Sequence, residues 1–211
     1  MRLTIFGPTG RTGRHLVQQA LAAGHELTAY ARTPSKLDLH HERLTVMQGD
    51  IYEAEKVAAA VAQADAVLSA LGPTRNGPKD VMAVGLQNIV AGMKQHSLRR
   101  LIVTTGAGVP APQDRPTLIN NIISFLLKLI SPDVLADSLR GIQIVRDSGL
   151  DWTVVRAPML VENPKVTNYR VGFLGPEAGR TLSRANFADF MLKQLEDDTY
   201  LHQMPLVTNT P

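Results

Sequence analysis

Short apolar runs alternate with amphipathic segments along the first 105 residues. The apolar runs, bounded by glycines or polar turns, predict buried strands at 3–6, 26–31, 44–47, 66–69 and 101–105. The segments between them repeat apolar positions at helical spacing and predict helices at 14–23, 53–62 and 81–96. This alternation is typical of an α/β fold, a doubly wound parallel sheet (Rossmann fold) with helices on both faces.

The alternation breaks after residue 105, and two long segments interrupt it. Residues 106–133 contain four prolines and an apolar stretch at 118–130, and residues 159–183 look irregular. The regular pattern predicts further helices at 136–148 and 186–196 and strands at 152–156 and 205–208. Both segments leave the carboxyl ends of strands, where this architecture binds ligands. We therefore expect a single domain over 1–211 with substrate-side insertions at 106–133 and 159–183.

The apolar stretch at 118–130 is shorter than the roughly 20 residues that a membrane span needs. It predicts a buried or partly buried helix, with a helix that covers a substrate pocket as the alternative. We expect no membrane span.

A glycine motif, Gly7-Pro8-Thr9-Gly10-Arg11-Thr12-Gly13, separates the first strand from the first helix. In such a motif Gly7 permits the tight turn, Gly10 lets the backbone approach a pyrophosphate, and Gly13 lets the helix pack close to the sheet. The free amides and the positive helix end then face the phosphates. The spacing therefore predicts a dinucleotide-binding site.

The end of the second strand indicates which dinucleotide binds. An acidic residue there would hydrogen-bond the ribose 2′-hydroxyl, but this chain has Ala31-Arg32-Thr33. Arg32 can bind a 2′-phosphate through two hydrogen bonds, and Arg11 could reach the same phosphate. The alternative for each arginine is a solvated surface position. We expect NADPH as the cofactor.

Two further strand ends would contact the cofactor. Asp50 follows the third strand, where its carboxylate either accepts from the adenine amino group or caps the helix at residue 53. Ala70, Leu71 and Gly72 end the fourth strand, where small residues let the cofactor pass close to the backbone.

Together these motifs resemble the atypical branch of the short-chain dehydrogenase/reductase superfamily, and within it the biliverdin-IXβ reductase/flavin reductase group of NAD(P)H-binding proteins. The matching stretches are GPTGRTG (7–13), ARTPSKL (31–37), GD (49–50), VMAVGLQNIVAGMK (81–94), SGLDWTVVRAP (148–158) and SRANFADFML (183–192). The resemblance implies an NADPH-dependent reductase of flavins, quinones or related conjugated acceptors. It also implies which residues lie beside the nicotinamide: Thr104, Thr105, Gly106, Arg156, Ala157, Pro158 and Met159.

The chain departs from the family at the catalytic positions. Many members use Tyr-x-x-x-Lys, but that spacing occurs here at Tyr52 and Lys56, directly after the third strand and too early in the fold. Gly106 and Met159 stand where the biliverdin reductase group has serine and histidine. Biliverdin is therefore disfavoured as the substrate. We assign no catalytic residue, and Thr104, Thr105 and Met159 remain candidates on the nicotinamide side.

Several polar residues have more ordinary interpretations. Arg156 is either a buried structural arginine or a substrate ligand. Asp137 and Asp147 are expected to be surface charges of a helix. The chain has no cysteine, and His40-His41 lacks accompanying carboxylates, so we expect no metal site.

Charge and composition narrow the partners. The net charge of +3 is scattered, so we expect no nucleic-acid partner. The start MRLTIFG lacks a secretory pattern, which predicts a cytoplasmic protein. We expect a small-molecule acceptor of the flavin or quinone type and a monomer or homodimer.

Hydride transfer from NADPH to a conjugated acceptor that takes its proton from water fits the missing catalytic groups. The alternative is a non-catalytic NAD(P)-binding redox sensor or regulator. An epimerase or dehydratase of a nucleotide-linked sugar would need the missing Tyr-x-x-x-Lys pair.

Overall fold

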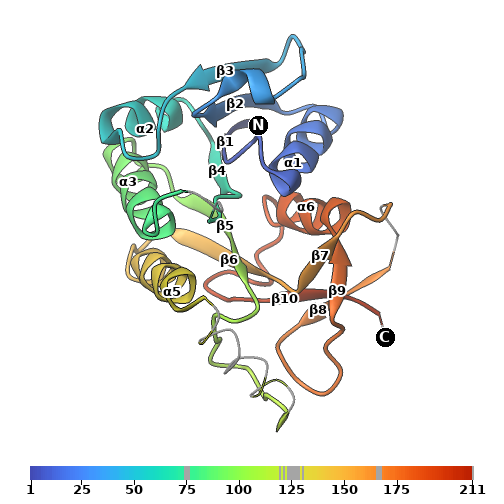
Figure 1. Cartoon of the computed structure of the whole chain (residues 1–211). Helices are drawn as coiled ribbons and strands as arrows, with labels where there is room; N and C mark the ends of the chain where they lie inside the picture. The colour runs from blue at the N-terminus through green and yellow to red at the C-terminus, as the bar shows by residue number, and fades with distance from the viewer. Residues whose placement is uncertain are drawn as a thin grey trace.

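A mostly parallel sheet with helices on both faces organises the chain (Figure 1). The computed structural model describes residues 1–73, 77–118, 120, 122, 129, 131–164 and 168–210. Over these residues the main sheet has eight strands in the order β3-β2-β1-β4-β5-β6-β10-β8. In that order the strands are β3 (Leu44–Gln48), β2 (Glu26–Ala31), β1 (Arg2–Phe6), β4 (Ala66–Ser69), β5 (Arg100–Gly106), β6 (Asp151–Ala157), β10 (Leu206–Asn209) and β8 (Tyr169–Gly172).

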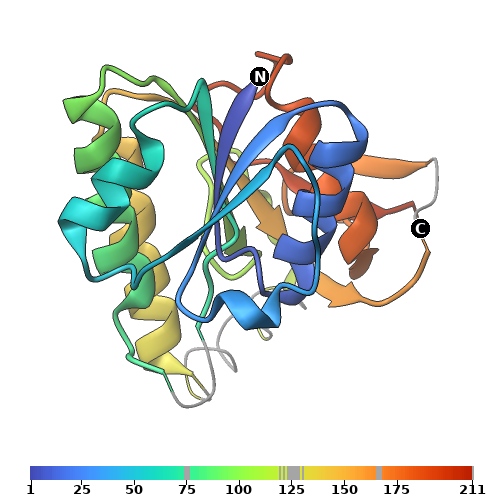
Figure 2. The same ribbon diagram turned by 90° about the horizontal axis from the view of Figure 1, so that it is seen from above.

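The helices cover the two faces of this sheet unequally. Figure 2 shows α1 (Arg11–Ala22) beside α6 (Arg184–Lys193) on one face. On the other face lie α2 (Ala54–Val61), α3 (Val81–Gln95) and α5 (Pro132–Arg146). The short helix η1 (Pro34–Lys36) follows β2. The predicted doubly wound Rossmann fold is thereby confirmed.

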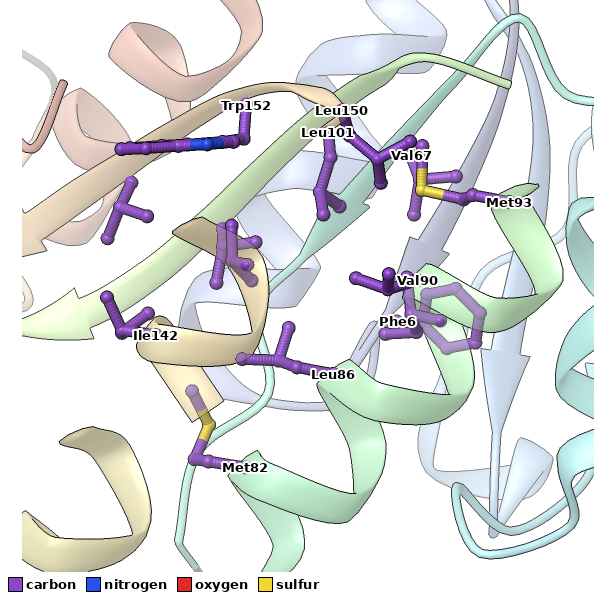
Figure 3. Close-up of a cluster of buried hydrophobic side chains, with 14 of the residues drawn as sticks. Phe6, Val67, Met82, Leu86, Val90, Met93, Leu101, Ile142, Leu150 and Trp152 are labelled. Carbon is purple, nitrogen blue, oxygen red and sulfur yellow. The ribbon is translucent and has the colours of Figure 1, made fainter. Parts of the chain in front are cut away.

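Alternation of side chains along the central strands divides the core into two apolar layers. On β1, Leu3 and Ile5 are buried against α1 and α6, whereas Phe6 points to the opposite layer. The layer in Figure 3 joins the strands to α3 and α5 through Phe6, Val67, Leu101, Leu86, Met93, Ile142 and Trp152. Full burial of one such large apolar side chain contributes about 1.5–3 kcal/mol, so this layer holds the helices in place.

The strand order reverses at β1, and this reversal defines the ligand side of the sheet. From β1 the chain first adds β2 and β3 on one side and then crosses to add β4, β5 and β6 on the other. The Ala70 amide donates to the Phe6 carbonyl across 2.9 Å, so the segments that leave β1 and β4 start side by side. In open α/β sheets, ligands bind at this switch point.

The prediction that residues 159–183 are irregular was wrong, because this insertion contains three strands. It contains β7 (Met159–Val161) and β9 (Thr181–Ser183), which pair in parallel as a separate two-stranded sheet. It also contains β8, which runs antiparallel to β10 at the edge of the main sheet. Each pairing joins segments distant in sequence, and alternation within one segment cannot reveal such partners.

The other predicted insertion is described only in part. Most of the apolar stretch at 118–130 lies outside the described residues. No helix in the described part of the chain is long and apolar enough to cross a membrane.

Asp137 is a buried helix cap, not the surface charge that its sequence context suggests. Its side chain lies on α5 and is 2% exposed. The carboxylate accepts hydrogen bonds from the amides of Met82 and Ala83, at 2.9 and 3.0 Å, in the first turn of α3. It therefore satisfies amides that an isolated helix leaves unpaired. Asp147 is exposed, as expected.

Candidate cofactor site

The glycine turn joins β1 to α1 and requires glycine at two of its positions. Gly7 has φ 74°, and a Cβ there would lie 2.7 Å from the Ala70 carbonyl oxygen. A Cβ on Gly13 would lie 2.0 Å from the Gly7 carbonyl oxygen, closer than any real contact. The Gly10 amide donates to the Gly7 carbonyl across 3.2 Å and closes the turn. The first amides of α1 are left without an intrahelical acceptor, which is the arrangement that binds an anion.

A cavity of about 330 Å³ opens beside this turn at the switch point of the sheet. It brings together eight of the residues expected to contact a cofactor: Gly7, Thr9, Gly10, Arg32, Asp50, Ala70, Leu71 and Gly72. These residues come from the ends of four parallel strands, whose carboxyl ends meet at one edge. The cavity therefore borders the carboxyl ends of β3, β2, β1 and β4.

One corner of the cavity is basic. Arg32 and Lys36 both line it, and both side chains are otherwise exposed. Lys36 was not predicted to contact the cofactor, although it stands four residues after Arg32. Pro34 begins η1 directly after β2, and this turn brings Lys36 back to the cavity. A proline at the start of such a turn was the available signal.

Two tyrosines, Tyr30 and Tyr52, also line the cavity, and neither was predicted to do so from the sequence. The Tyr30 hydroxyl donates to the Asp50 carbonyl at 2.8 Å, and burial raises the Tyr30 pKa to about 12. The Tyr52 hydroxyl donates to Asp80 Oδ1 at 2.6 Å. Burial and this hydrogen bond raise the pKa of Tyr52. Both phenols therefore stay protonated and act as hydrogen-bond donors with an aromatic face.

The carboxylate of Asp50 does not cap α2. The N-cap residue of α2 is Glu53, and Asp50 Oδ1 instead accepts from the Tyr52 amide at 3.2 Å. This leaves the Asp50 side chain in a turn on the cavity wall. Of the two roles considered for it, the helix cap is excluded.

The remaining expected residues lie around the cavity without lining it. Arg11 Nη1 is 3.9 Å from Glu162 Oε1, which directs it toward the segment after β7. Thr12 and Gly13 lie within the first turn of α1. Thr104 and Thr105 are near the end of β5, Pro158 directly follows β6, and the exposed Met159 begins β7. These four residues therefore lie near the carboxyl ends of β5 and β6.

The second cavity, of about 250 Å³, lies near the first one. Gly72 lines the first cavity and the next residue, Pro73, lines the second. The second cavity is bordered by the end of β5 and the start of α5, through Gly106, Gly108, Val109, Ser131, Val134, Leu135 and Ser138. This lining has apolar and hydroxyl side chains and no titratable group among the residues that the structure describes.

Arg156 supports the wall of this second cavity and is a structural residue. Its side chain is fully buried and pairs with Asp114. It also donates to the carbonyls of Val109 and Met204, at 3.1 and 2.8 Å. These bonds occupy the guanidinium, so of the two roles considered for Arg156 the structure supports the structural one.

The described residues form neither a Tyr-x-x-x-Lys catalytic pair nor a cluster of metal ligands. The Tyr52 hydroxyl bonds Asp80 while Lys56 Nζ pairs with Glu53 at 2.7 Å, so these two residues do not form a catalytic pair. No group of three or more potential metal ligands occurs in the described part of the chain.

Comparison with known proteins agrees with this geometry. The family described as NAD(P)H-binding matches residues 7–198, nearly the whole length from the glycine turn to the segment after α6. The chain belongs to the NAD(P)H-binding family. The predicted resemblance to NAD(P)H-binding proteins is thereby confirmed.

Individual relatives of this NAD(P)H-binding protein are distant. A 3-beta-hydroxysteroid dehydrogenase of Mycolicibacterium neoaurum is 32% identical over 120 residues, which are 51% of this chain and 32% of that protein. The chain thus spans about a third of that curated relative's length.

Two solved structures share the fold over almost the whole chain. One is a short-chain dehydrogenase/reductase from Veillonella parvula in complex with NADP, at 21% identity and TM-score 0.79, covering 99% of this chain and 94% of that one. The other is ChuY, an anaerobillin reductase from Escherichia coli O157:H7, at 17% identity and TM-score 0.81, covering 99% and 97%.

The residues present fit an NAD(P) cofactor on three observations. The positions of Gly7 and Gly13 leave no room for a side chain beside the anion-binding helix end. The basic pair Arg32 and Lys36 lines the same cavity as Gly7. At the carboxyl end of β4 and near that of β5, the hydroxyl oxygens of Ser69 and Thr105 are buried with no hydrogen-bond partner in the described part of the chain. Buried hydroxyls normally have partners, so these two retain hydrogen-bonding capacity at the ligand edge of the sheet.

Proposed function

We propose that this protein binds NADPH in the 330 Å³ cavity and reduces a conjugated acceptor of the flavin or quinone type in the adjoining apolar one. The observation that carries the proposal is that two consecutive residues beyond the carboxyl end of β4, Gly72 and Pro73, line the two cavities. A dinucleotide that follows the first cavity would present its nicotinamide there. In this proposal residues 1–211 form a single NAD(P)-binding domain.

The cofactor contacts follow from the chemistry of the lining. The turn at 7–13 and the first amides of α1 would hold the pyrophosphate, with Arg11 and Thr12 at its edge. Arg32 and Lys36 would hold the 2′-phosphate, since a guanidinium binds a phosphate through paired hydrogen bonds. The Asp50 carboxylate would accept from the adenine amino group. When bound, the reduced nicotinamide supplies a hydride.

The acceptor side would bind and orient the substrate. Thr104, Thr105, Pro158 and Met159 would flank the nicotinamide, while Val109, Val134 and Leu135 would supply apolar walls. A conjugated acceptor can take its proton from water, so the lining needs no acid of its own. The protein would contribute proximity and orientation, while the cofactor carries the chemistry of hydride transfer.

Relatives support the reductase class without defining the acceptor. ChuY is named a reductase, and a curated relative from Zea mays is named an isoflavone reductase homolog. The Veillonella parvula relative, solved with NADP, supports the phosphorylated cofactor.

Turnover is the direct test. We would follow NADPH oxidation by the purified protein at saturating cofactor, with and without FMN and a panel of quinones. We expect acceptor-dependent oxidation well above the rate without protein. Tight NADP⁺ binding without turnover for any acceptor would instead favour a redox sensor or regulator, a role that the absence of titratable groups in the described lining also suits.

A further inference from the structure

Arg14 links the two parts of the cofactor cavity that would bind phosphate. The residue lies in the first turns of α1, on its exposed side. Its Nε donates to the Thr9 carbonyl at 3.2 Å, within the glycine turn. Its Nη2 donates to the carbonyl of Lys36, at the end of η1. One guanidinium therefore joins two segments that the sequence separates by a strand and a helix.

Both bonds end on segments that line the same cavity. Thr9 belongs to the turn assigned to the pyrophosphate, and Lys36 to the basic corner assigned to the 2′-phosphate. The guanidinium bonds backbone carbonyls, so it constrains the position of each segment rather than one side chain. A planar guanidinium holds two acceptors at a set separation, which a flexible ammonium cannot do.

The basic corner needs such a constraint. Beyond β2, the turn at 33–37 is closed by local bonds from the Lys36 amide to Thr33 and from the Leu37 amide to Pro34. The Leu37 side chain anchors one end of the turn in the core. Arg14 adds the bond that ties this turn to the phosphate-binding loop of α1.

We infer that Arg14 is a positioning residue for cofactor choice, holding the 2′-phosphate corner at the correct distance from the pyrophosphate turn. The inference rests on the proposed NADPH site. Arg14 acts through the placement of Arg32 and Lys36, so its loss should weaken binding of the phosphorylated cofactor selectively.

The test compares NADP⁺ and NAD⁺ affinities, by titration, for the unaltered protein and for Arg14→Met. We expect the NADP⁺ dissociation constant to rise about tenfold, the equivalent of about 1.4 kcal/mol, and the NAD⁺ constant to change by less than about twofold. Gln18→Met, one turn further along the exposed side of α1, is the matched control and should change neither. Equal weakening of both cofactors, or no change, would overturn the inference.

Arg14→Lys separates positioning from simple attraction of charge. It keeps the positive charge but cannot bridge both carbonyls, so we expect it to lose NADP⁺ affinity as Arg14→Met does. Retained NADP⁺ affinity in this variant would overturn the positioning role. If the unaltered protein bound NAD⁺ as tightly as NADP⁺, the NADPH assignment itself would fall, and the inference with it.

Discussion

The Arg156 guanidinium donates two hydrogen bonds to the Asp114 carboxylate, at 2.7 and 2.6 Å, across 42 residues of sequence. The same carboxylate accepts from the amides of Ala111 and Leu174, at 2.8 and 2.9 Å. The Asp114 side chain therefore connects β6, the first insertion and the segment after β8. The wall of the apolar cavity depends on this buried ion pair.

Breaking this ion pair should destabilise the protein strongly. Asp114→Asn keeps the size of the side chain but leaves the buried Arg156 charge uncompensated. We expect the free energy of unfolding to fall by about 3–5 kcal/mol, measured by urea denaturation. Asp147→Asn, on the exposed end of α5, is the control and should stay within about 0.5 kcal/mol. A similar small change in Asp114→Asn would show that the pair contributes little.

The same pair should make stability depend on pH. Burial alone would raise the Asp114 pKa, but Arg156 and the two backbone amides hold it below the ordinary value of 3.8. A carboxyl with a lowered pKa in the folded state stabilises the protein above its unfolded pKa and stops doing so as pH falls through the folded one. We therefore expect the stability difference between the unaltered protein and Asp114→Asn to be constant near neutrality and to narrow below pH 3.8. Urea titrations over this range would measure it, and a difference independent of pH would contradict the assignment.

Removal of the buried cap on α3 should also cost stability. Asp137→Ala leaves the amides of Met82 and Ala83 without their acceptor, so we expect a loss of about 1–2 kcal/mol in unfolding free energy. Asp133→Ala is the matched control, because Asp133 lies on α5 like Asp137 but is exposed and contacts Lys79 at the surface. Equal effects of the two substitutions in thermal or urea unfolding would argue against the cap.

The basic corner should select the phosphorylated cofactor. Arg32→Glu places a negative charge beside the proposed 2′-phosphate, so we expect NADPH affinity to fall about 100-fold while NADH affinity is retained. Arg146→Glu, an exposed arginine at the end of α5, is the control. Fluorescence titration with both cofactors would measure the effect. NADPH affinity that survives in Arg32→Glu would remove the 2′-phosphate assignment.

Close packing at the glycine turn should be intolerant of a methyl group. Gly13→Ala would bring a Cβ within 2.0 Å of the Gly7 carbonyl oxygen, so the turn must shift away from its anion-binding geometry. We expect NADP⁺ affinity to fall at least about 100-fold by titration. Gly172→Ala on β8 has open space around it and should bind normally. Undiminished binding in Gly13→Ala would show that the turn does not hold the cofactor.

The elements of the fold were predictable because their signals are local. Buried parallel strands read as apolar runs, and the helices between them repeat apolar residues every three or four positions. The glycine motif was predictable for the same reason, since a tight turn and a close helix approach impose their residue types within seven positions. Arg32 stands directly at the end of β2, so its place at the cavity needed only the strand boundary.

By itself, then, the sequence determined the order of the regular elements from β1 to β6, the glycine turn and one arginine at the larger cavity. Tertiary structure alone decided that Asp137 caps another helix, that Asp114 neutralises Arg156, and that β7 pairs with β9. It also decided that Arg14 ties the Lys36 carbonyl to the glycine turn. The physical reason is that each of these contacts joins residues far apart along the chain. Hydrogen bonds and ion pairs of this kind depend on how distant segments pack together. The pattern of apolar residues within one segment does not identify its partner.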